Sequence, residues 1–294
     1  MFGLSDEYYG ELRLHTYHLD GDGYQKYFFK EQELLMKREW FAHIKDVPKE
    51  YILSAPQCLG ESGYDFNGYI VSNAVLRFQR TINTLLREGI IRRLKEKSSR
   101  VYIMEIGGGY GALAYQLSKR LENTTYVIVD LPETLLFSAV YLSICLPEKS
   151  IYIYDKDYYV KLNSNFSGYD FVLIPNTVVS SLKGMQFDTV LNTASFQEMR
   201  PTQLNIYLDL ISEVLIGELY SWNEDVQLQN TERVNVSVQL RKRFNVKRIN
   251  HGVSSLRYRS GFSYLLLDMS LRKILNRFFI KPSVPSIEYI CTKK

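Results

Sequence analysis

Cysteine and histidine are scarce in this chain, with three and four copies among 294 residues. The three cysteines, Cys58, Cys145 and Cys291, have no spacing typical of a disulfide framework or a zinc site, so we expect neither. No run approaches the roughly 20 apolar residues of a membrane-spanning helix, and we expect no such span. The N-terminus lacks a basic region followed by an apolar run, so we expect no secretory signal and a cytoplasmic protein.

The composition is that of a globular protein, with 46% hydrophobic and 23% charged residues. Tyrosine is frequent, with 23 copies, and its rings either stack on ligands in clefts or replace phenylalanine in the core. The net charge of +4 is uneven, because residues 224–294 hold fourteen Lys and Arg but five Asp and Glu. This tail is either a surface for an anionic substrate or an ordinary solvated face.

The hydrophobic pattern changes near residue 100. Residues 1–98 show helical periodicity at 26–44 and 70–94, whereas later residues alternate short apolar strands with helices. This predicts an α/β fold with a mostly parallel, doubly wound, Rossmann-like sheet over 99–294 and a mainly helical N-terminal cap over 1–98. We expect strands at 101–106, 126–130, 151–154, 171–174, 187–191, 219–222 and 287–291, helices at 112–121, 133–146, 201–216 and 271–280, and a β-rich tail from 233, where V-N-V-S-V-Q-L alternates.

A glycine-rich turn follows the first of these strands. The string E-I-G-G-G-Y-G spans residues 105–111 and contains Gly107, Gly108, Gly109 and Gly111. Glycine permits positive φ and lets backbone N–H groups approach a ligand closely. The helix that follows adds a positive partial charge suited to a carboxylate or phosphate. The turn therefore predicts a nucleotide-binding site.

Two acidic residues indicate which nucleotide binds there. Asp130 ends the next strand, where it can accept hydrogen bonds from both ribose hydroxyls. The glycines also satisfy the loose fingerprint of NAD-binding proteins. Glu105 favours S-adenosylmethionine (SAM), because its carboxylate suits an ammonium or sulfonium and would repel a pyrophosphate.

The pattern E-x-G-x-G-x-G closely resembles that of class I SAM-dependent methyltransferases. The resemblance implies SAM as cofactor, a class I methyltransferase fold, and a SAM-binding domain over 99–294. It also implies that Glu105 and the Gly107–Gly111 backbone hold the methionine part, that Asp130 holds the ribose and that Leu131 flanks the adenine.

The adenine edge should meet the end of the third core strand, and two segments compete for that position. Asp155 and Asp157 follow the apolar run at 151–154, whereas Asn176 and Thr177 follow the run at 171–174. We favour Asn176 as the adenine-binding residue.

A second motif, F-D-T-V-L-N-T-A-S-F-Q-E-M, spans residues 187–199. Asn192 and Thr193 fall at the carboxyl end of its strand, where ligands bind in open α/β sheets, and we expect both to contact the cofactor. Together with D-L-P-E at 130–133 and Y-S-W-N at 220–223, the motif resembles a bacterial sugar O-methyltransferase family over roughly residues 101 to 223. The resemblance implies methyl transfer to a hydroxyl of a sugar or glycosylated metabolite, as in polysaccharide biosynthesis.

Other functions stay open at this point. They are methyl transfer to another small molecule, SAM binding without catalysis, and an NAD-dependent oxidoreductase. The N/D-P-P-Y signature of amino-methylating enzymes is missing, so no nucleic-acid partner is expected. The sequence does not decide whether the chain forms a homo-oligomer.

Candidate residues for the chemistry follow the second motif. Glu198 is the first candidate for the general base, or else a carboxylate that stabilises the start of the next helix. His251, in a glycine-containing turn, is a second candidate base or a structural histidine. Four further residues are expected to bind substrate hydroxyls: Tyr110, Ser195, Gln197 and Asn223. No compact set of metal ligands is visible, so no metal is predicted.

Overall fold

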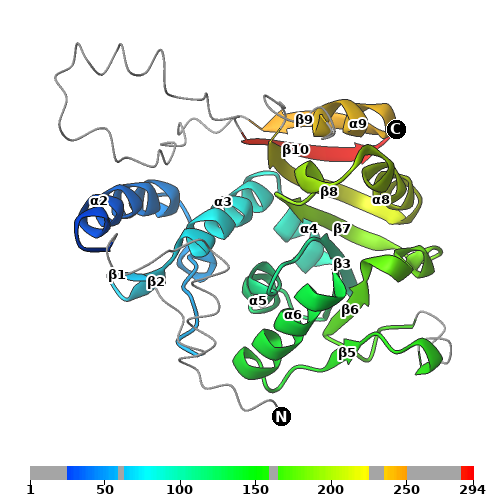
Figure 1. Cartoon of the computed structure of the whole chain (residues 1–294), viewed down its shortest axis with the longest axis horizontal. Coiled ribbons are helices and arrows are strands. Elements are labelled where there is room, and N and C mark those ends of the chain that lie inside the picture. The colour runs from blue at the N-terminus through cyan, green and yellow to red at the C-terminus, as the bar shows by residue number, and fades with distance from the viewer. Residues whose placement is uncertain (1–24, 59–62, 159–164, 225–234, 250–285) are drawn as a thin grey trace.

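The computed structural model describes residues 25–58, 63–158, 165–224, 235–249 and 286–294, with side chains from residue 33 onward. Its main feature is an eight-stranded sheet in the order β5-β6-β4-β3-β7-β8-β10-β9 (Figure 1). The strands are β3 (Val101–Ile106), β4 (Thr124–Asp130), β5 (Ile151–Ile153), β6 (Phe171–Pro175), β7 (Phe187–Thr193), β8 (Leu215–Glu224), β9 (Phe244–Ile249) and β10 (Ser286–Lys293).

All pairs in this sheet are parallel except the two that involve β10. From β3 the sheet continues with β4, β6 and β5 on one side and with β7, β8, β10 and β9 on the other, which confirms the predicted doubly wound, Rossmann-like arrangement. The order reverses between β3 and β7. Ligands of open α/β sheets bind in the crevice at the carboxyl ends of such strands.

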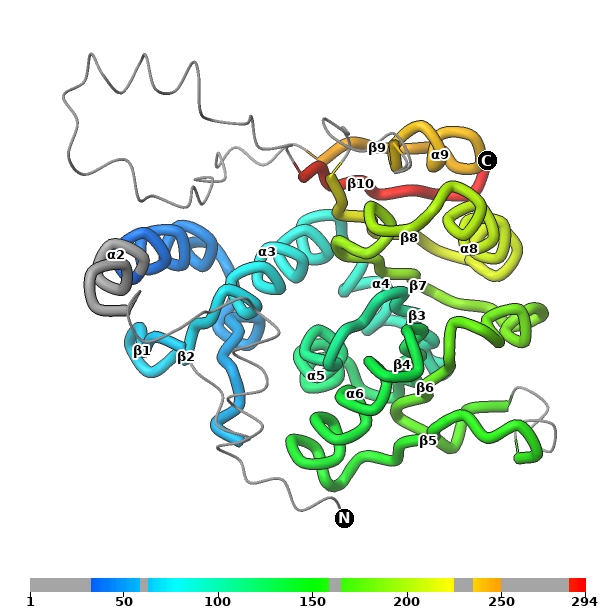
Figure 2. Tube along the Cα trace, in the orientation of Figure 1, coloured from blue at the N-terminus to red at the C-terminus, as the bar shows by residue number. Residues whose placement is uncertain are grey.

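Helices cover both faces of the sheet (Figure 2). The helices that follow the first sheet strand are α5 (Ala112–Ser118), α6 (Pro132–Cys145), α8 (Pro201–Val214) and α9 (Val236–Arg243). Along β3, Ile103 packs into the cluster that holds α5 and α6, whereas Met104 packs into the cluster that holds α8 and α9. No helix in the described ranges combines the length and apolar character that crossing a bilayer requires.

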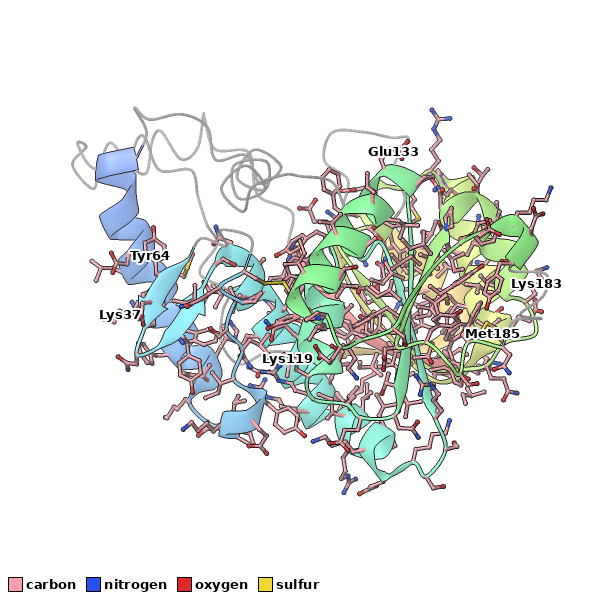
Figure 3. The ribbon with its side chains drawn as sticks, turned by 90° about the horizontal axis from the view of Figure 1, so that it is seen from below. Lys37, Tyr64, Lys119, Glu133, Lys183 and Met185 are labelled. Carbon is pink, nitrogen blue, oxygen red and sulfur yellow. A yellow bond between two sulfur atoms is a disulfide. The ribbon has the colours of Figure 1, made fainter. Side chains whose placement is uncertain are left out.

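The described part of the N-terminal region contains α2 (Gln25–Ile44), the 3₁₀ helix η1 (Lys49–Tyr51), a hairpin of β1 (Tyr64–Phe66) and β2 (Tyr69–Val71), α3 (Asn73–Arg87) and α4 (Ile90–Glu96). Its buried side chains belong to the same hydrophobic cluster as α5 and α6. Figure 3 shows Lys37 and Tyr64 of this region on the opposite side of the molecule from Lys183 and Met185.

The expectation of one helix over 70–94 is wrong. Strand β2 takes the first residues, and the Ser72 hydroxyl begins α3 by accepting a hydrogen bond from the Val75 N–H at 3.3 Å. Gly89 then adopts φ +70° and separates α3 from α4. A left-handed residue ends a helix even where the apolar periodicity continues.

The expectation of β structure directly after residue 233 is also corrected. Residues 236–243 form α9, whose first turn is capped by the Asn235 side chain accepting from the Val238 N–H at 3.3 Å. Val236 and Leu240 are buried four residues apart, so an alternating pattern also satisfies one helical face. The later tail strands form β9 and β10, while the helix expected at 271–280 lies outside the described residues.

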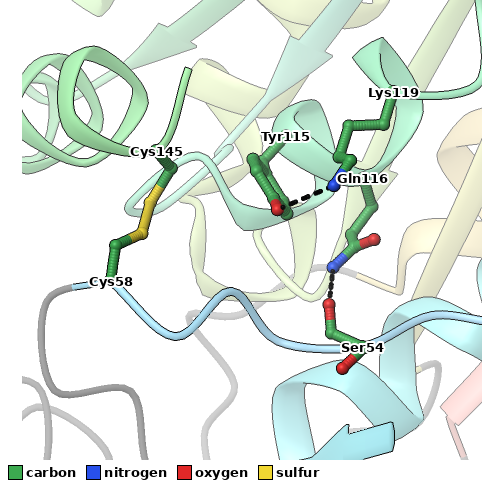
Figure 4. Close-up of a disulfide and its surroundings, with 6 residues drawn as sticks. All are labelled: Ser54, Cys58, Tyr115, Gln116, Lys119 and Cys145. Carbon is green, nitrogen blue, oxygen red and sulfur yellow. Dashed lines mark hydrogen bonds between the residues drawn. A yellow bond between two sulfur atoms is a disulfide. The ribbon is translucent and has the colours of Figure 1, made fainter. Parts of the chain in front are cut away.

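A disulfide joins Cys58 to Cys145 at the end of α6, contrary to the expectation that the cysteines do not pair (Figure 4). Their Cα atoms are 6.2 Å apart although 87 positions separate them, and spacing in sequence carries no information about such a contact. The segment before Cys58 is held against α5, because Gln116 donates to the Ser54 carbonyl at 2.7 Å and Arg120 donates to the Ile52 carbonyl at 2.9 Å.

Candidate functional site

The glycine turn between β3 and α5 has the backbone geometry that its sequence predicts. Gly107, Gly109 and Gly111 all have positive φ, at +75°, +58° and +90°. A Cβ on Gly107 would clash with the side chain of Ser195, so this position is closed by the loop after β7. A Cβ on Gly109 would meet nothing within 4 Å. The turn is therefore tightly packed at its first glycine and open at its third.

Asp130 lies directly beside this turn. Its Oδ2 accepts from the Gly109 N–H at 2.8 Å and its Oδ1 accepts from the Leu131 N–H at 2.7 Å. Burial raises the pKa of Asp130, and the two backbone N–H groups lower it by a smaller amount. The turn is fixed from the other side, because the Ser138 hydroxyl of α6 donates to the Gly109 carbonyl at 2.6 Å. One carboxylate thus joins the ends of β3 and β4.

Glu105 is 1% exposed beneath the turn. A Cβ on Gly108 would lie 3.2 Å from Glu105 Oε2, and the Tyr126 hydroxyl donates to the same oxygen at 2.8 Å. Burial raises the pKa of Glu105 to about 8, the negative charge of Asp130 adds to the shift, and the Tyr126 hydrogen bond and the positive charge of Arg77 oppose it. A pKa above neutral favours the protonated carboxyl at pH 7 when no ligand is present, and a bound cation would favour the ionised form.

The third core strand is β6, because it pairs directly with β4 while β5 lies beyond it at the sheet edge. Pro175 is in register with Asp130, which puts Asn176 at the carboxyl edge next to the site. The Asn176 Oδ1 is buried and has no hydrogen-bond partner among the described residues. Its competitor Asp155 follows the outer strand, where its Oδ1 accepts from the Tyr158 N–H at 2.7 Å.

Asn192 and Thr193 are the last two residues of β7, and their side chains point to opposite faces of the sheet. Asn192 donates to the Ile106 carbonyl at 2.8 Å and to the Ser195 hydroxyl. Ser195 itself donates to the same carbonyl at 3.0 Å. Asn192 therefore fixes the loop that covers Gly107, while Thr193 lies on the face that carries α3.

Asn223 and Gln197 extend this network. The Asn223 side chain donates to Asn192 Oδ1 at 2.8 Å and accepts from the Gln197 N–H at 3.2 Å. The Gln197 Oε1 accepts from the Glu224 N–H at 2.6 Å. Three of the residues expected to bind substrate, Ser195, Gln197 and Asn223, thus hold one another and the ends of β7 and β8 in place.

The other predicted residues have different surroundings. The Tyr110 ring packs edge-on against Tyr141 of α6, with 4.9 Å between ring centroids. Glu198 is exposed in the 3₁₀ helix η3 (Phe196–Glu198), and its N–H donates to the Ser195 carbonyl at 3.1 Å. Leu131 precedes α6 with 51% of its surface exposed. His251 lies outside the described residues.

Helix α3 adds residues that the sequence did not indicate. Arg80 forms an ion pair with Glu288 of β10, which is buried, and its Cζ lies 4.9 Å from the centroid of the Trp222 ring. Trp222 is in register with both Thr193 and Glu288 at the carboxyl edge. Arg77 lies one turn before Arg80 and its positive charge acts on Glu105. Arginines beside an apolar helical stripe resemble a solvated face, so no signal in the sequence distinguished them.

No group of three or more His, Cys, Asp or Glu side chains within the described ranges is arranged to hold a metal ion.

No protein-family model and no curated protein matches the sequence. Similar solved structures include an O-methyltransferase family protein from Burkholderia thailandensis, at TM-score 0.40 and 10% identity over 76% of this chain and 60% of that one. The mitomycin 7-O-methyltransferase MmcR has TM-score 0.40 and 10% identity over 88% and 68%. The CurJ carbon methyltransferase has TM-score 0.42 and 14% identity over 76% and 59%. The chain therefore spans less than two thirds of the first and third of these.

The fold is α/β and Rossmann-like. All strand pairs of the sheet are parallel except the two that involve β10, and a glycine turn leads from β3 into α5. The likenesses to solved structures, all at TM-scores of 0.42 or lower for these three, add no argument about cofactor, reaction or acceptor.

Proposed function

We propose that this chain binds SAM and transfers its methyl group to a hydroxyl of a sugar or glycosylated metabolite. The observation that carries the proposal is the arrangement around the glycine turn. Asp130 lies against the turn, Glu105 lies beneath it, and the unpartnered Asn176 Oδ1 lies at the next strand end. Each of these groups complements a different part of one nucleoside that carries an amino acid.

The residues fit SAM part by part. A carboxylate offers about four hydrogen-bond acceptor positions. Asp130 can therefore accept hydrogen bonds from ribose hydroxyls while it keeps its hydrogen bonds from two backbone N–H groups. Asn176 Oδ1 would accept from the adenine amino group, and the exposed Leu131 side chain would cover the adenine face. Glu105 would ionise to bind the ammonium. A dinucleotide fits less well, because its negatively charged pyrophosphate would approach the buried carboxyl of Glu105.

SAM, when bound, supplies a methyl group that is already activated by the sulfonium. The chain has to align the acceptor oxygen with the methyl carbon and take the hydroxyl proton as the carbon–oxygen bond forms and the carbon–sulfur bond breaks. Glu198 is the proposed base, supported by its position in the loop that covers Gly107. His251 is retained as the second candidate base. We also propose that residues 1–98 form a cap over the acceptor side.

Turnover measurements test this proposal. The protein would be incubated with methyl-labelled SAM and a panel of sugar nucleotides and glycosides, and labelled products identified by mass spectrometry. With an accepted substrate, Glu198→Gln should lower kcat by about 10²- to 10⁴-fold while SAM affinity is unchanged. The exposed Glu122→Gln is a matched control and should leave kcat unchanged.

An unchanged kcat in Glu198→Gln would exclude Glu198 as the base, and His251→Ala would then be measured. Turnover only with acceptors other than sugars would refute the sugar assignment. Binding of SAM without turnover on any acceptor would favour a non-catalytic SAM-binding protein. The satisfied hydrogen bonds of Gln197 and Asn223 are the observation that keeps this second candidate in view.

A further inference from the structure

Arg77 is a half-buried arginine of α3 that has no ion-pair partner among the described residues. Its Nε atom is buried and has no hydrogen-bond partner in the part of the chain that the structure describes. Its guanidinium carbon lies 5.2 Å from the Phe78 ring centroid, which is a contact with its own helix neighbour. A buried guanidinium N–H without an acceptor is costly, and no described residue supplies an acceptor to this Nε–H group.

The register of the sheet places Glu105 on the face that α3 covers. Glu105, Leu191 and Tyr220 lie in one row across β3, β7 and β8 and point toward the helices on the α3 side. Thr81 of α3 lies over this row, because its hydroxyl is 3.3 Å from the Tyr220 hydroxyl.

Arg77 is one helical turn before that contact, and its carbonyl accepts from the Thr81 hydroxyl at 3.5 Å. Its positive charge lowers the pKa of Glu105, as expected for two groups that face the same space. A cation of α3 and an acid of β3 therefore interact electrostatically, and Glu105 already has Tyr126 as its hydrogen-bond donor.

We infer that Arg77 and Glu105 together form the receptor for the α-amino acid group of the cofactor, with Arg77 binding the carboxylate and Glu105 the ammonium. The inference rests on the proposed function and assigns a role to a helix outside the expected cofactor domain. A zwitterion carries one charge of each sign on one carbon, and the site offers one group of each kind. Guanidinium binds carboxylate through two parallel N–H bonds, which supplies the acceptor that Arg77 lacks.

Three ligands that differ only in the amino acid part test this inference by calorimetric titration. S-adenosylhomocysteine carries both charges, its decarboxylated analogue keeps only the ammonium, and 5′-methylthioadenosine lacks the amino acid part. The variants are Arg77→Met, which keeps the length and packing of the side chain, and Arg77→Lys. The matched control is Arg92→Met, since the Arg92 side chain is 74% exposed and pairs with Glu96 in its own helix.

We expect the wild-type protein to bind S-adenosylhomocysteine roughly 10- to 100-fold more tightly than the decarboxylated analogue, the effect of a charge-assisted hydrogen bond. Arg77→Met should bind S-adenosylhomocysteine more weakly than the wild type by that same factor. It should bind the other two ligands with wild-type affinity. Arg77→Lys should recover part of it, and Arg92→Met should match the wild type for all three.

Equal weakening for all three ligands in Arg77→Met, or no weakening, would overturn the inference. Equal wild-type affinity for S-adenosylhomocysteine and its decarboxylated analogue would overturn it without any variant, so the test survives if Arg77→Met fails to fold. Wild-type binding of 5′-methylthioadenosine establishes the adenosine site in either case. Binding of none of the three would instead refute the proposed function.

Discussion

Replacing Glu105 by Gln should change how the stability of the protein depends on pH. Glu105 is 1% exposed and accepts from the Tyr126 hydroxyl at 2.8 Å. Burial raises the pKa of its carboxyl to about 8, from an ordinary value of 4.5. Gln has the shape of the protonated acid and can accept the same hydrogen bond, but it does not titrate.

The sign follows from proton binding. Between pH 4.5 and 8 the folded protein keeps the Glu105 proton while the unfolded chain has lost it, so the contribution of Glu105 to stability falls as pH rises. Each pH unit in this window lowers the free energy of unfolding by about 1.4 kcal/mol. From pH 5 to pH 8 the wild type should therefore lose about 4 kcal/mol relative to Glu105→Gln, as an order of magnitude.

Urea unfolding of both proteins at pH 5, 6, 7 and 8, without ligand, measures this difference. We expect the free energy of unfolding of Glu105→Gln to rise relative to that of the wild type at each pH step. The rise should become smaller near pH 8. The control Glu122→Gln, at an exposed site, should follow the wild type. A constant difference between Glu105→Gln and the wild type across the whole range would refute the buried, protonated state of Glu105.

Two further substitutions test the packing of the turn and the disulfide. Gly107→Ala should lower the free energy of unfolding by about 2–4 kcal/mol, because φ is +75° and the methyl would clash with Ser195. Gly184→Ala is the control for backbone strain alone, because Gly184 has φ +85° and an added Cβ would meet nothing within 4 Å. If thermal melts show the same loss of stability for Gly107→Ala and Gly184→Ala, the clash with Ser195 is contradicted. Cys145→Ser should cost about 2–4 kcal/mol without reductant and almost nothing in dithiothreitol. Three titratable thiols in the unreduced, unfolded wild type would show that Cys58 and Cys145 are not joined.

The cysteine measurement also bears on the compartment. A persistent disulfide is typical of oxidising surroundings, whereas the sequence predicted a cytoplasmic protein. The disulfide and the predicted cytoplasmic location lead to opposite expectations for protein that is isolated from its native cells under alkylating conditions. Alkylation of both Cys58 and Cys145 would show free thiols and favour the cytoplasm. An intact disulfide between them would favour an oxidising compartment.

The sheet was predictable because its strands are short apolar runs bounded by glycine and acidic residues. Val101–Ile106 has the predicted limits, and the strand that ends in Asp130 begins two residues earlier than expected. The helix α9 was missed because its Val residues alternate, a pattern that fits a strand as well as one buried helical face. The break at Gly89 was missed because apolar periodicity continues through it.

The positions of the candidate residues were predictable where a residue lies at the end of its own strand. Asp130 lies beside the turn and Asn176 follows the strand that pairs with β4, since carboxyl ends of parallel strands share one edge of the sheet. Arg77 was not predictable, because α3 reaches this edge through tertiary packing that the sequence does not encode locally. The same holds for the Asn223 side chain, whose partners lie on another strand and its loop.

Calorimetric titration with S-adenosylhomocysteine and, separately, with NADH, on the wild type and on Asp130→Ala, tests the central claim most directly. The account predicts that S-adenosylhomocysteine binds, that NADH does not, and that Asp130→Ala weakens binding by about tenfold or more, since ribose hydroxyls lose a charged acceptor. Binding of NADH alone, or of neither ligand, would contradict it.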